Sequence, residues 1–304
     1  MIVSPPRGGA VAAASVPPTS LARELDPDVE ALRLEIERLA PWHHDIEIAP
    51  GVITSARAAN HPDKSFEEHY SPARMMDGLI AALYPAGLAG RSFLDCACNS
   101  GGHSLAAARL GAGRIFAFDA RQHWIDQAEF IARAGRAPNL VSRRCTLEEL
   151  PQLDLEPFDL TLFAGIFYHL PDPVAGLRIA ADLTKEILVV NTATHPHRLP
   201  ALVLTPESAT HVLSGVGRLA WLPSGPEVMR DILAYCGFKY ARVDAYWTSG
   251  PKGWKRLQMV AARDPQFLRD YDRLRPMEPK PQSLPRRLAH SLQMRASVWR
   301  NQRR

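Results

Sequence analysis

The sequence predicts an α/β fold in which helices cover a doubly wound, mostly parallel sheet. The first observation is an apolar run at 92–96 that enters a turn of small residues and then a helical pattern at 104–110. The second is another apolar run, 114–119, which ends in Asp119. A strand, a turn, a helix and an acid-tipped strand within about 30 residues are typical of a nucleotide-binding βαβ unit. The sequence therefore predicts a cofactor site at this turn.

The turn itself carries Ala97, Asn99 and Gly101 at the positions where a dinucleotide fingerprint has glycines. Small residues let the backbone approach a ligand closely, and the first turn of the next helix offers unpaired N–H groups. A carboxylate at the position of Asp119 can accept hydrogen bonds from a ribose diol. Because two of the three glycines are replaced, the turn is a weak match to a pyrophosphate site.

These residues resemble the first motif of class I S-adenosylmethionine (SAM)-dependent methyltransferases, which implies a Rossmann-like, seven-stranded core. Residues 140–151 resemble the third strand and adenine loop of that family, and 158–173 resemble its fourth strand and the segment that leaves it. The resemblance implies SAM as cofactor, with S-adenosylhomocysteine (SAH) as product. The cofactor-binding residues that it implies are Asp95, Ala97, Asn99, Gly101, Asp119, Ala120, Thr146, Leu147, Ala164 and Tyr168.

A closer similarity, over roughly residues 35–263, connects the chain with tRNA wobble-uridine carboxymethyltransferases and their unassigned methyltransferase relatives. It is carried by Pro41-Trp-His-His, Gly165-Ile-Phe-Tyr-His and Trp221-Leu-Pro-Ser, among others. That family uses a carboxylated SAM, whose extra carboxylate meets a motif lysine, a tyrosine at the position of Tyr168 and an arginine at the position of Arg256. Here His44 replaces the lysine, and an imidazole is mostly neutral near pH 7. We therefore expect ordinary SAM and transfer of a methyl group.

Methyl transfer to a hydroxyl requires that the protein align the nucleophile and remove its proton. His169 is the first candidate for this base and His195 the second, with Tyr168 as an orienting hydroxyl. The alternative for His169 is a structural role in its turn. The residues expected to contact the substrate are Trp42, His44, Asn191, Trp221 and Arg256. For the tryptophans the alternative is core packing, and for Arg256 it is a buried carboxylate.

Three functions stay open at this point. The first is base-assisted methyl transfer to a hydroxyl of a small polar molecule, such as a sugar or secondary metabolite. The second is methyl or carboxymethyl transfer to a wobble uridine of tRNA. The third is an inactive SAM-fold binding module, because Ala97 and Asn99 replace glycines. No metal is expected, since His43 and His44 are adjacent in sequence and no carboxylate–histidine cluster follows them.

Composition agrees with an enzyme built on one substantial core, since the 304 residues are 46% hydrophobic and 22% charged. No apolar run reaches the ~18 residues of a membrane span, so a cytoplasmic location is expected. The four cysteines lack zinc-ligand spacing and are expected to be reduced.

From Arg275 onward eight basic residues accompany a single acidic one. This tail could bind RNA or an anionic membrane, dock on the protein's own surface, or serve solubility alone.

The expected organisation is a series of segments around one domain, and the sequence predicts no particular oligomeric state. The segments are a disordered N-terminus at 1–20, a helical collar or lid at 21–90, the SAM-binding core at 91–263 with a substrate insertion at 192–225, and the basic tail at 264–304. Within them, helices are expected at 27–40, 71–88 and 226–237, the fifth strand at 186–191, and a closing hairpin at 240–247 and 256–262.

Overall fold

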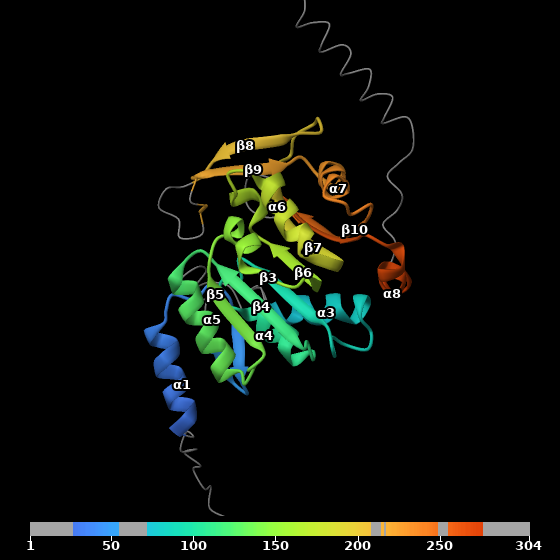
Figure 1. Cartoon of the computed structure of the whole chain (residues 1–304). Helices are drawn as coiled ribbons and strands as arrows, with labels where there is room; N and C mark the ends of the chain where they lie inside the picture. Colours follow the sequence, from blue (N-terminus) through green and yellow to red (C-terminus); the bar gives the residue numbers. More distant parts are fainter. Residues whose placement is uncertain (1–26, 55–71, 208–213, 216, 249–254, 276–304) are drawn as a thin grey trace, which may run out of the picture.

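A seven-stranded sheet runs through the centre of the computed structural model, which describes residues 27–54, 72–207, 214–215, 217–248 and 255–275 (Figure 1). Its strand order is β10-β11-β7-β6-β3-β4-β5, and all neighbours from β5 to β7 are parallel, whereas β11 is antiparallel to both β7 and β10. The strands are β3 (Ser92–Cys96), β4 (Arg114–Asp119), β5 (Leu140–Arg144), β6 (Phe158–Ala164), β7 (Thr184–Thr194), β10 (Tyr240–Thr248) and β11 (Lys255–Ala262). The predicted doubly wound, mostly parallel sheet is confirmed.

Helices cover both faces of this sheet, because alternate strand residues point to opposite sides and both sides are apolar. Phe93 belongs to the core on the side of α3, α4 and α5, whereas Leu94 belongs to the core on the side of α6 and α7. The helices are α1 (Pro27–Arg38), α3 (Pro72–Leu83), α4 (Gly102–Arg109), α5 (Gln122–Ala134), α6 (Pro173–Asp182), α7 (Pro226–Tyr235) and α8 (Arg269–Leu274), with 3-10 turns η2 (Leu147–Leu153), η3 (Phe167–His169) and η4 (Pro265–Leu268). None of these described helices has the length and apolar character needed to cross a membrane.

The N-terminal collar contains a hairpin as well as helices. Strands β1 (Ile46–Ala49) and β2 (Val52–Thr54) pair between α1 and α3. The hairpin touches the start of α4, where an added Cβ on Gly102 would lie 3.0 Å from Ile46 Cδ1 and 2.8 Å from Pro72 Cγ. The collar therefore lies directly against the helix that follows the cofactor turn.

Two predicted boundaries are wrong. The fifth strand, β7, continues to Thr194, because pairing of β7 with β11 extends to Thr194 opposite Lys255. The insertion therefore begins three residues later than expected, and it forms the hairpin β8 (Leu202–Pro206) and β9 (Leu219–Pro223).

Residues 265–274 form η4 and α8 rather than a tail, since Leu268 and Tyr271 are buried in the core. The predicted disorder of 1–20 and the basic residues beyond Arg275 lie outside the described residues.

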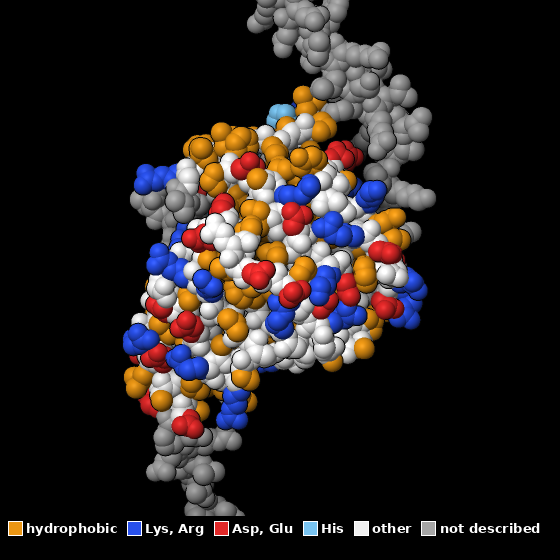
Figure 2. All heavy atoms as spheres, viewed as in Figure 1, with side chains coloured by type: hydrophobic (Ala, Val, Ile, Leu, Met, Phe, Trp, Pro, Cys, Tyr) orange, Lys and Arg blue, Asp and Glu red, His pale blue; other side chains and the backbone are white. Residues whose placement is uncertain are grey.

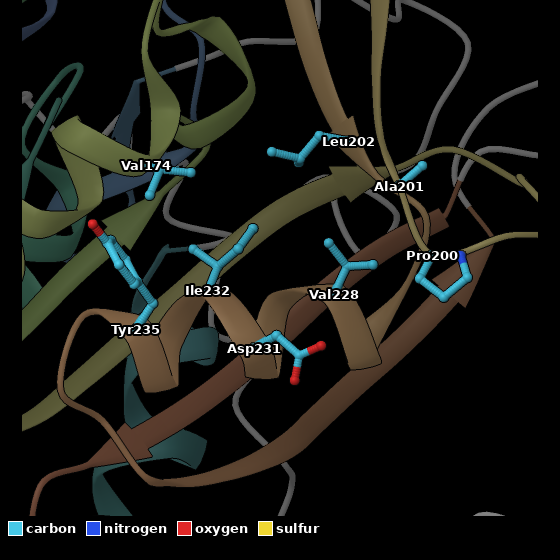
Figure 3. Close-up of a pocket in the computed structure, with 8 residues that line it drawn as sticks. All are labelled: Val174, Pro200, Ala201, Leu202, Val228, Asp231, Ile232 and Tyr235. Atoms are coloured by element: carbon cyan, nitrogen blue, oxygen red, sulfur yellow. The ribbon is translucent and has the colours of Figure 1, made fainter.

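A hollow of about 350 Å³ lies outside the sheet, between α6, α7 and the start of β8 (Figure 3). Its lining is mostly apolar and consists of Val174, Pro200, Ala201, Leu202, Val228, Asp231, Ile232 and Tyr235. None of these residues was predicted to bind cofactor or substrate. The hollow adjoins the surface where Figure 2 shows hydrophobic side chains gathered over the β8–β9 hairpin and α7.

The close approach at Gly102 generates a prediction. Gly102→Ala should destabilise the protein by about 1–3 kcal/mol, because the added methyl group overpacks the contact between the collar and α4. Urea denaturation of the full chain measures this change. Gly113→Ala is the control, since a Cβ there would have no neighbour closer than 3.7 Å. Equal stabilities of the two variants would contradict the predicted contact.

Candidate active site

The turn after β3 has the backbone conformation of a glycine-rich turn although two of its glycines are missing. Ala97, Asn99 and Gly101 have φ angles of 54°, 51° and 75°. L-residues with side chains seldom adopt this left-handed region, although asparagine tolerates it better than most. The Asn99 side chain contributes directly, since its Oδ1 accepts a 2.8 Å hydrogen bond from the Ser100 N–H. Replacement of the glycines therefore leaves the shape of the turn intact.

Asp119 lies beside this turn, at the carboxyl end of β4. Its Oδ2 accepts a 3.2 Å hydrogen bond from the Asn99 N–H, and its Oδ1 accepts a 3.1 Å bond from the Arg121 N–H. Burial raises the pKa of Asp119, and these N–H donors oppose the rise. Each carboxylate oxygen retains a further lone pair, so the group can still accept hydrogen bonds from a ribose diol.

Asp95 lies in β3 directly before the turn and is only 2% exposed. The Ser104 hydroxyl donates a 2.7 Å hydrogen bond to its Oδ2. Burial raises the pKa of Asp95 to about 7, although the hydrogen bonds from Ser104 act in the opposite direction. Among the described residues, neither Asp95 nor Asp119 is within ion-pair distance of a basic side chain.

This donor and acceptor set fits SAM. Two buried carboxylates that have no basic partner among the described residues suit a ligand that brings an ammonium group, a sulfonium charge and two ribose hydroxyls. The predicted adenine loop adjoins them, because the Cys145 N–H donates a 3.2 Å hydrogen bond to the carbonyl of Asp119. Thr146 and Leu147 follow at the start of η2, where Thr146 and Glu149 form a reciprocal capping box. Ala120 and Ala164 lie at the ends of β4 and β6, as the resemblance implies.

A cationic group lies on the other side of the site, where β6 and β7 end and β11 begins. Arg256 Nη1 donates a 2.9 Å hydrogen bond to Tyr168 Oη, and Arg256 Nε donates a 3.0 Å bond to Asn191 Oδ1. The structure therefore brings together three residues that the sequence analysis singled out separately. The side-chain amide of Asn191 is engaged with Arg256 and Gln258, so its predicted contact with a substrate would be made through Arg256.

His44 belongs to the same region and is almost completely buried. Its pKa is well below the ordinary value, first because of burial and then because of the nearby His43, His103 and Arg256. A neutral His44 is what the sequence analysis expected where the resembling family has a lysine. Arg256 thus provides a permanent positive charge on this side of the site.

His169 contacts a carboxylate that the sequence analysis did not single out. Its Nδ1 lies 2.8 Å from Oε1 of Glu207, which directly follows β8 in the insertion. Glu207 Oε2 accepts a 2.8 Å hydrogen bond from the Gly215 N–H, so the carboxylate is held on both sides. Burial lowers the pKa of His169, and Glu207 partly offsets this effect. Glu207 has no motif of its own, and its place in the expected substrate insertion was the only sequence signal.

The remaining candidates lie in different surroundings. His195 follows β7, where its N–H donates to the carbonyl of Pro223, and its buried Nδ1 has no hydrogen-bond partner among the described residues. The indole N–H of Trp221 donates a 3.2 Å hydrogen bond to the carbonyl of Pro171. Trp42 is 2% exposed, and its N–H donates to the carbonyl of Ile36. Trp42 is thus packed in the core, and its predicted contact with a substrate stays a prediction.

Comparison with known proteins agrees with this geometry. Residues 88–222 match the family model described as "Methyltransferase domain". The fold and the site are of the class I, SAM-dependent type of methyltransferase, and residues 88–222 are similar to a domain of that type.

Particular relatives are of two kinds. The chain is 35% identical over 174 residues to the tRNA U34 carboxymethyltransferase of Marinobacter nauticus, which covers 53% of this chain and 48% of the relative. It is 32% identical over 154 residues to the ubiquinone biosynthesis O-methyltransferase of Caulobacter vibrioides, which covers 48% of this chain and 58% of the relative. The chain thus spans about half the length of the curated relatives that it matches.

The solved N-terminal domain of EvdMO1, whose structure was determined in the presence of SAH and D-fucose, has the same fold. Its TM-score is 0.60 with 21% sequence identity, and the alignment covers 77% of this chain and 95% of that domain. At this identity the similarity concerns the fold alone.

The raised pKa of Asp95 generates a prediction about stability. The Asp95 carboxyl group keeps its proton up to about pH 7 in the folded protein but only up to about pH 3.8 in the unfolded chain. The folded protein therefore loses stability as the pH rises between these two values. The free energy of unfolding of Asp95→Asn, relative to that of the unmodified protein, should therefore be about 2 kcal/mol greater at about pH 8.5 than at about pH 5.5.

Urea denaturation of the cofactor-free protein at both pH values measures this difference. The control is Asp182→Asn, which makes the same substitution at a carboxylate whose side chain is 67% exposed. A gain for Asp95→Asn that is the same at both pH values would contradict the prediction.

Proposed function

We propose that this protein transfers the methyl group of SAM to a hydroxyl group of a small polar molecule, such as a sugar, with His169 as general base. The observation that carries this proposal is the 2.8 Å contact between His169 Nδ1 and Glu207 Oε1. The pair is not oriented as a hydrogen bond, but the charge of a carboxylate this close favours the tautomer with its proton on Nδ1, which leaves the lone pair of Nε2 free to accept a proton.

The surroundings of His169 suit a base near neutral pH. Burial lowers the pKa of His169, so its imidazole is neutral at pH 7 and able to accept a proton. Glu207 would then stabilise the imidazolium that forms when the substrate hydroxyl gives up its proton. SAM, when bound, supplies an electrophilic methyl group. The part of the protein is to hold the hydroxyl in line with that group and to remove the proton.

A polar acceptor agrees with the other side of the site. Because Tyr168 Oη accepts a hydrogen bond from Arg256, its own proton is available for another acceptor, and the pair can donate to hydroxyl or carbonyl oxygens. One comparison favours a hydroxyl acceptor, because the Caulobacter relative is named an O-methyltransferase. We also propose a cytoplasmic location, because all four cysteines are free and buried.

A second candidate, modification of a tRNA wobble uridine, is favoured by the names of several relatives and by the retained Tyr168 and Arg256. Against it stands the neutral His44 in the place of a lysine. On the face of the described residues that Figure 2 shows, basic and acidic side chains are intermixed, which is unlike a continuous track for a phosphate backbone. RNA binding that weakens steeply with salt would support this candidate, and a flat response would remove it.

The base assignment predicts that His169→Gln lowers kcat by about 10²–10⁴-fold, as loss of a general base does. The affinity for SAM should remain within about threefold, since the carboxylates expected to bind the cofactor belong to residues other than His169. The assay measures SAH release with a panel of sugar acceptors, and calorimetric titration measures SAM binding. His197→Gln is the control, because the side chain of this loop histidine forms hydrogen bonds only with the backbone of Leu199 among the described residues. Unchanged turnover in His169→Gln would remove His169 as the base.

The same assignment predicts a pH effect. Turnover should fall as the pH drops through the pKa of His169, which lies below the ordinary value of 6.5. Glu207→Gln should lower kcat and move this acid limb to still lower pH, because the charge of Glu207 raises the pKa of His169. A pH profile of kcat checks both effects, and an acid limb at the same pH in both proteins would show that Glu207 does not act on the base.

The choice between SAM and its carboxylated form predicts the effect of a cation at position 44. His44→Lys should raise the affinity for carboxylated SAM relative to SAM about tenfold, or about 1.4 kcal/mol, because a second positive charge is added beside Arg256. Calorimetric titration with each ligand gives the ratio. His43→Lys adds the same charge to the neighbouring residue and serves as the control. A ratio that is unchanged in His44→Lys would contradict the idea that position 44 sets this selectivity.

A further inference from the structure

A row of buried polar side chains crosses three strands next to the candidate active site. Asn191 on β7 and Gln258 on β11 are 4% and 5% exposed, and the side chain of Asp244 on β10 is 6% exposed. Their neighbours along the strands, such as Val190 and Met259, are apolar and buried. A buried polar group in such surroundings is unfavourable unless it is hydrogen-bonded. The row therefore needs a structural or functional reason.

The side chains of the row form a continuous series of hydrogen bonds that ends at Arg256. Gln258 Nε2 donates a 2.8 Å bond to Asp244 Oδ2, and Asn191 Nδ2 donates a 3.0 Å bond to Gln258 Oε1. Arg256 Nε then donates to Asn191 Oδ1, and Arg256 Nη1 donates to Tyr168 Oη. One end of the series is thus a carboxylate, and the other is the cation of the site.

The chemistry of the two ends fixes the direction of this series. A carboxylate only accepts hydrogen bonds and a guanidinium only donates them, whereas each amide between them can be turned either way. Only one orientation of Gln258 and Asn191 satisfies both ends. It presents the Asn191 oxygen, and not its NH₂ group, to Arg256.

Asp244 reaches the row because of an irregularity in β10. The register between β10 and β11 shifts between Val243, opposite Met259, and Ala245, opposite Gln258, so Asp244 is the extra residue of a β-bulge. Bulges redirect side chains and are frequent beside active sites. Since β10 is otherwise regularly paired, the bulge serves to turn this carboxylate toward Gln258.

The charge of Asp244 has a partner other than Arg256. Its Oδ1 lies 3.4 Å from Arg275 Nη2 and accepts a hydrogen bond from Tyr271 Oη. In the part of the chain that the structure describes, no carboxylate lies within ion-pair distance of Arg256. The series thus orients the guanidinium of Arg256 through neutral amides and leaves its charge uncompensated.

We propose that Asp244, acting through Gln258 and Asn191, is a positioning residue that fixes the guanidinium of Arg256 against Tyr168. The carboxylate determines how both amides are turned, and the amides determine where the guanidinium points. A contact between Arg256 and the substrate rests on the proposed function. The positioning of Arg256 by Asp244 does not depend on the proposed function, so the two ideas can be tested separately.

The test follows the Nε–H of Arg256 by NMR in the full-length protein labelled with ¹⁵N-arginine, without any acceptor. Arg256→Lys assigns the signal. Gln258→Leu should raise the hydrogen-exchange rate of this N–H about tenfold or more, because the hydrogen bond from Arg256 to Asn191 loses its support. Asp244→Asn should raise it severalfold, since an amide at position 244 allows both orientations of the series.

The matched control is Thr161→Val. Thr161 is fully buried in β6 of the same sheet and accepts a 2.7 Å hydrogen bond from Thr184, outside the row. The control should leave the exchange of Arg256 Nε–H unchanged. A rate that rises as much in Thr161→Val as in the row variants would overturn the proposal, as would an unchanged rate in Asp244→Asn. If Gln258→Leu does not fold, the shape-preserving Asp244→Asn decides alone.

Discussion

The site depends on the point at which the order of the strands reverses. The chain leaves β3 toward β4 and β5 on one side, and β6 and β7 then add to the other side, so the carboxyl ends of β3, β4 and β6 meet around one crevice. The left-handed backbone conformation of Ala97, Asn99 and Gly101 keeps the turn after β3 tight at this point. Its Asn99 N–H also fixes Asp119. The positions of the two carboxylates and of His169 all follow from this reversal.

The two sides of the crevice differ in charge, and this difference organises the chemistry. The β3–β4 side carries Asp95 and Asp119, which suit a cofactor with cationic groups. The β6–β7–β11 side carries Arg256, whose described neighbours are a phenol, an amide and a neutral imidazole. The His169–Glu207 pair also lies at the exit of β6, which places a proton acceptor on the side opposite the cofactor carboxylates.

Much of the fold could be predicted from local pattern, because strands such as β3, β4 and β6 are short apolar runs ended by small or acidic residues. The run at 114–119 coincides with β4, and the hairpin at 240–247 and 256–262 nearly coincides with β10 and β11. The end of β7 could not be predicted, because Thr192 and Thr194 are polar and become strand through pairing with β11. Trp42 was assigned to the substrate because an aromatic residue in a motif suits either a ligand or a core, and only packing decides between them.

The site was only partly predictable for a similar reason. Motif residues such as Asp119 and Tyr168 follow strand ends and could be found by position. Glu207, Gln258 and Asp244 gain their significance from partners that are distant in the chain, 38 residues away in the case of Glu207 and His169. A β-bulge and a loop contact leave no periodic signal in the sequence, so these residues emerge only from the three-dimensional structure.

The contact between His169 and Glu207 has a consequence for the divergence of this protein. The histidine belongs to the core of the fold, but the carboxylate that orients it belongs to the hairpin insertion, which also receives a hydrogen bond from Arg121 next to Asp119. Under the proposed function, an exchange of the insertion for one that admits another acceptor would remove the partner of the proposed base at the same time. Acceptor range and proton removal would then be inherited together, and a graft that aims to change the first would have to carry an acidic residue for the second.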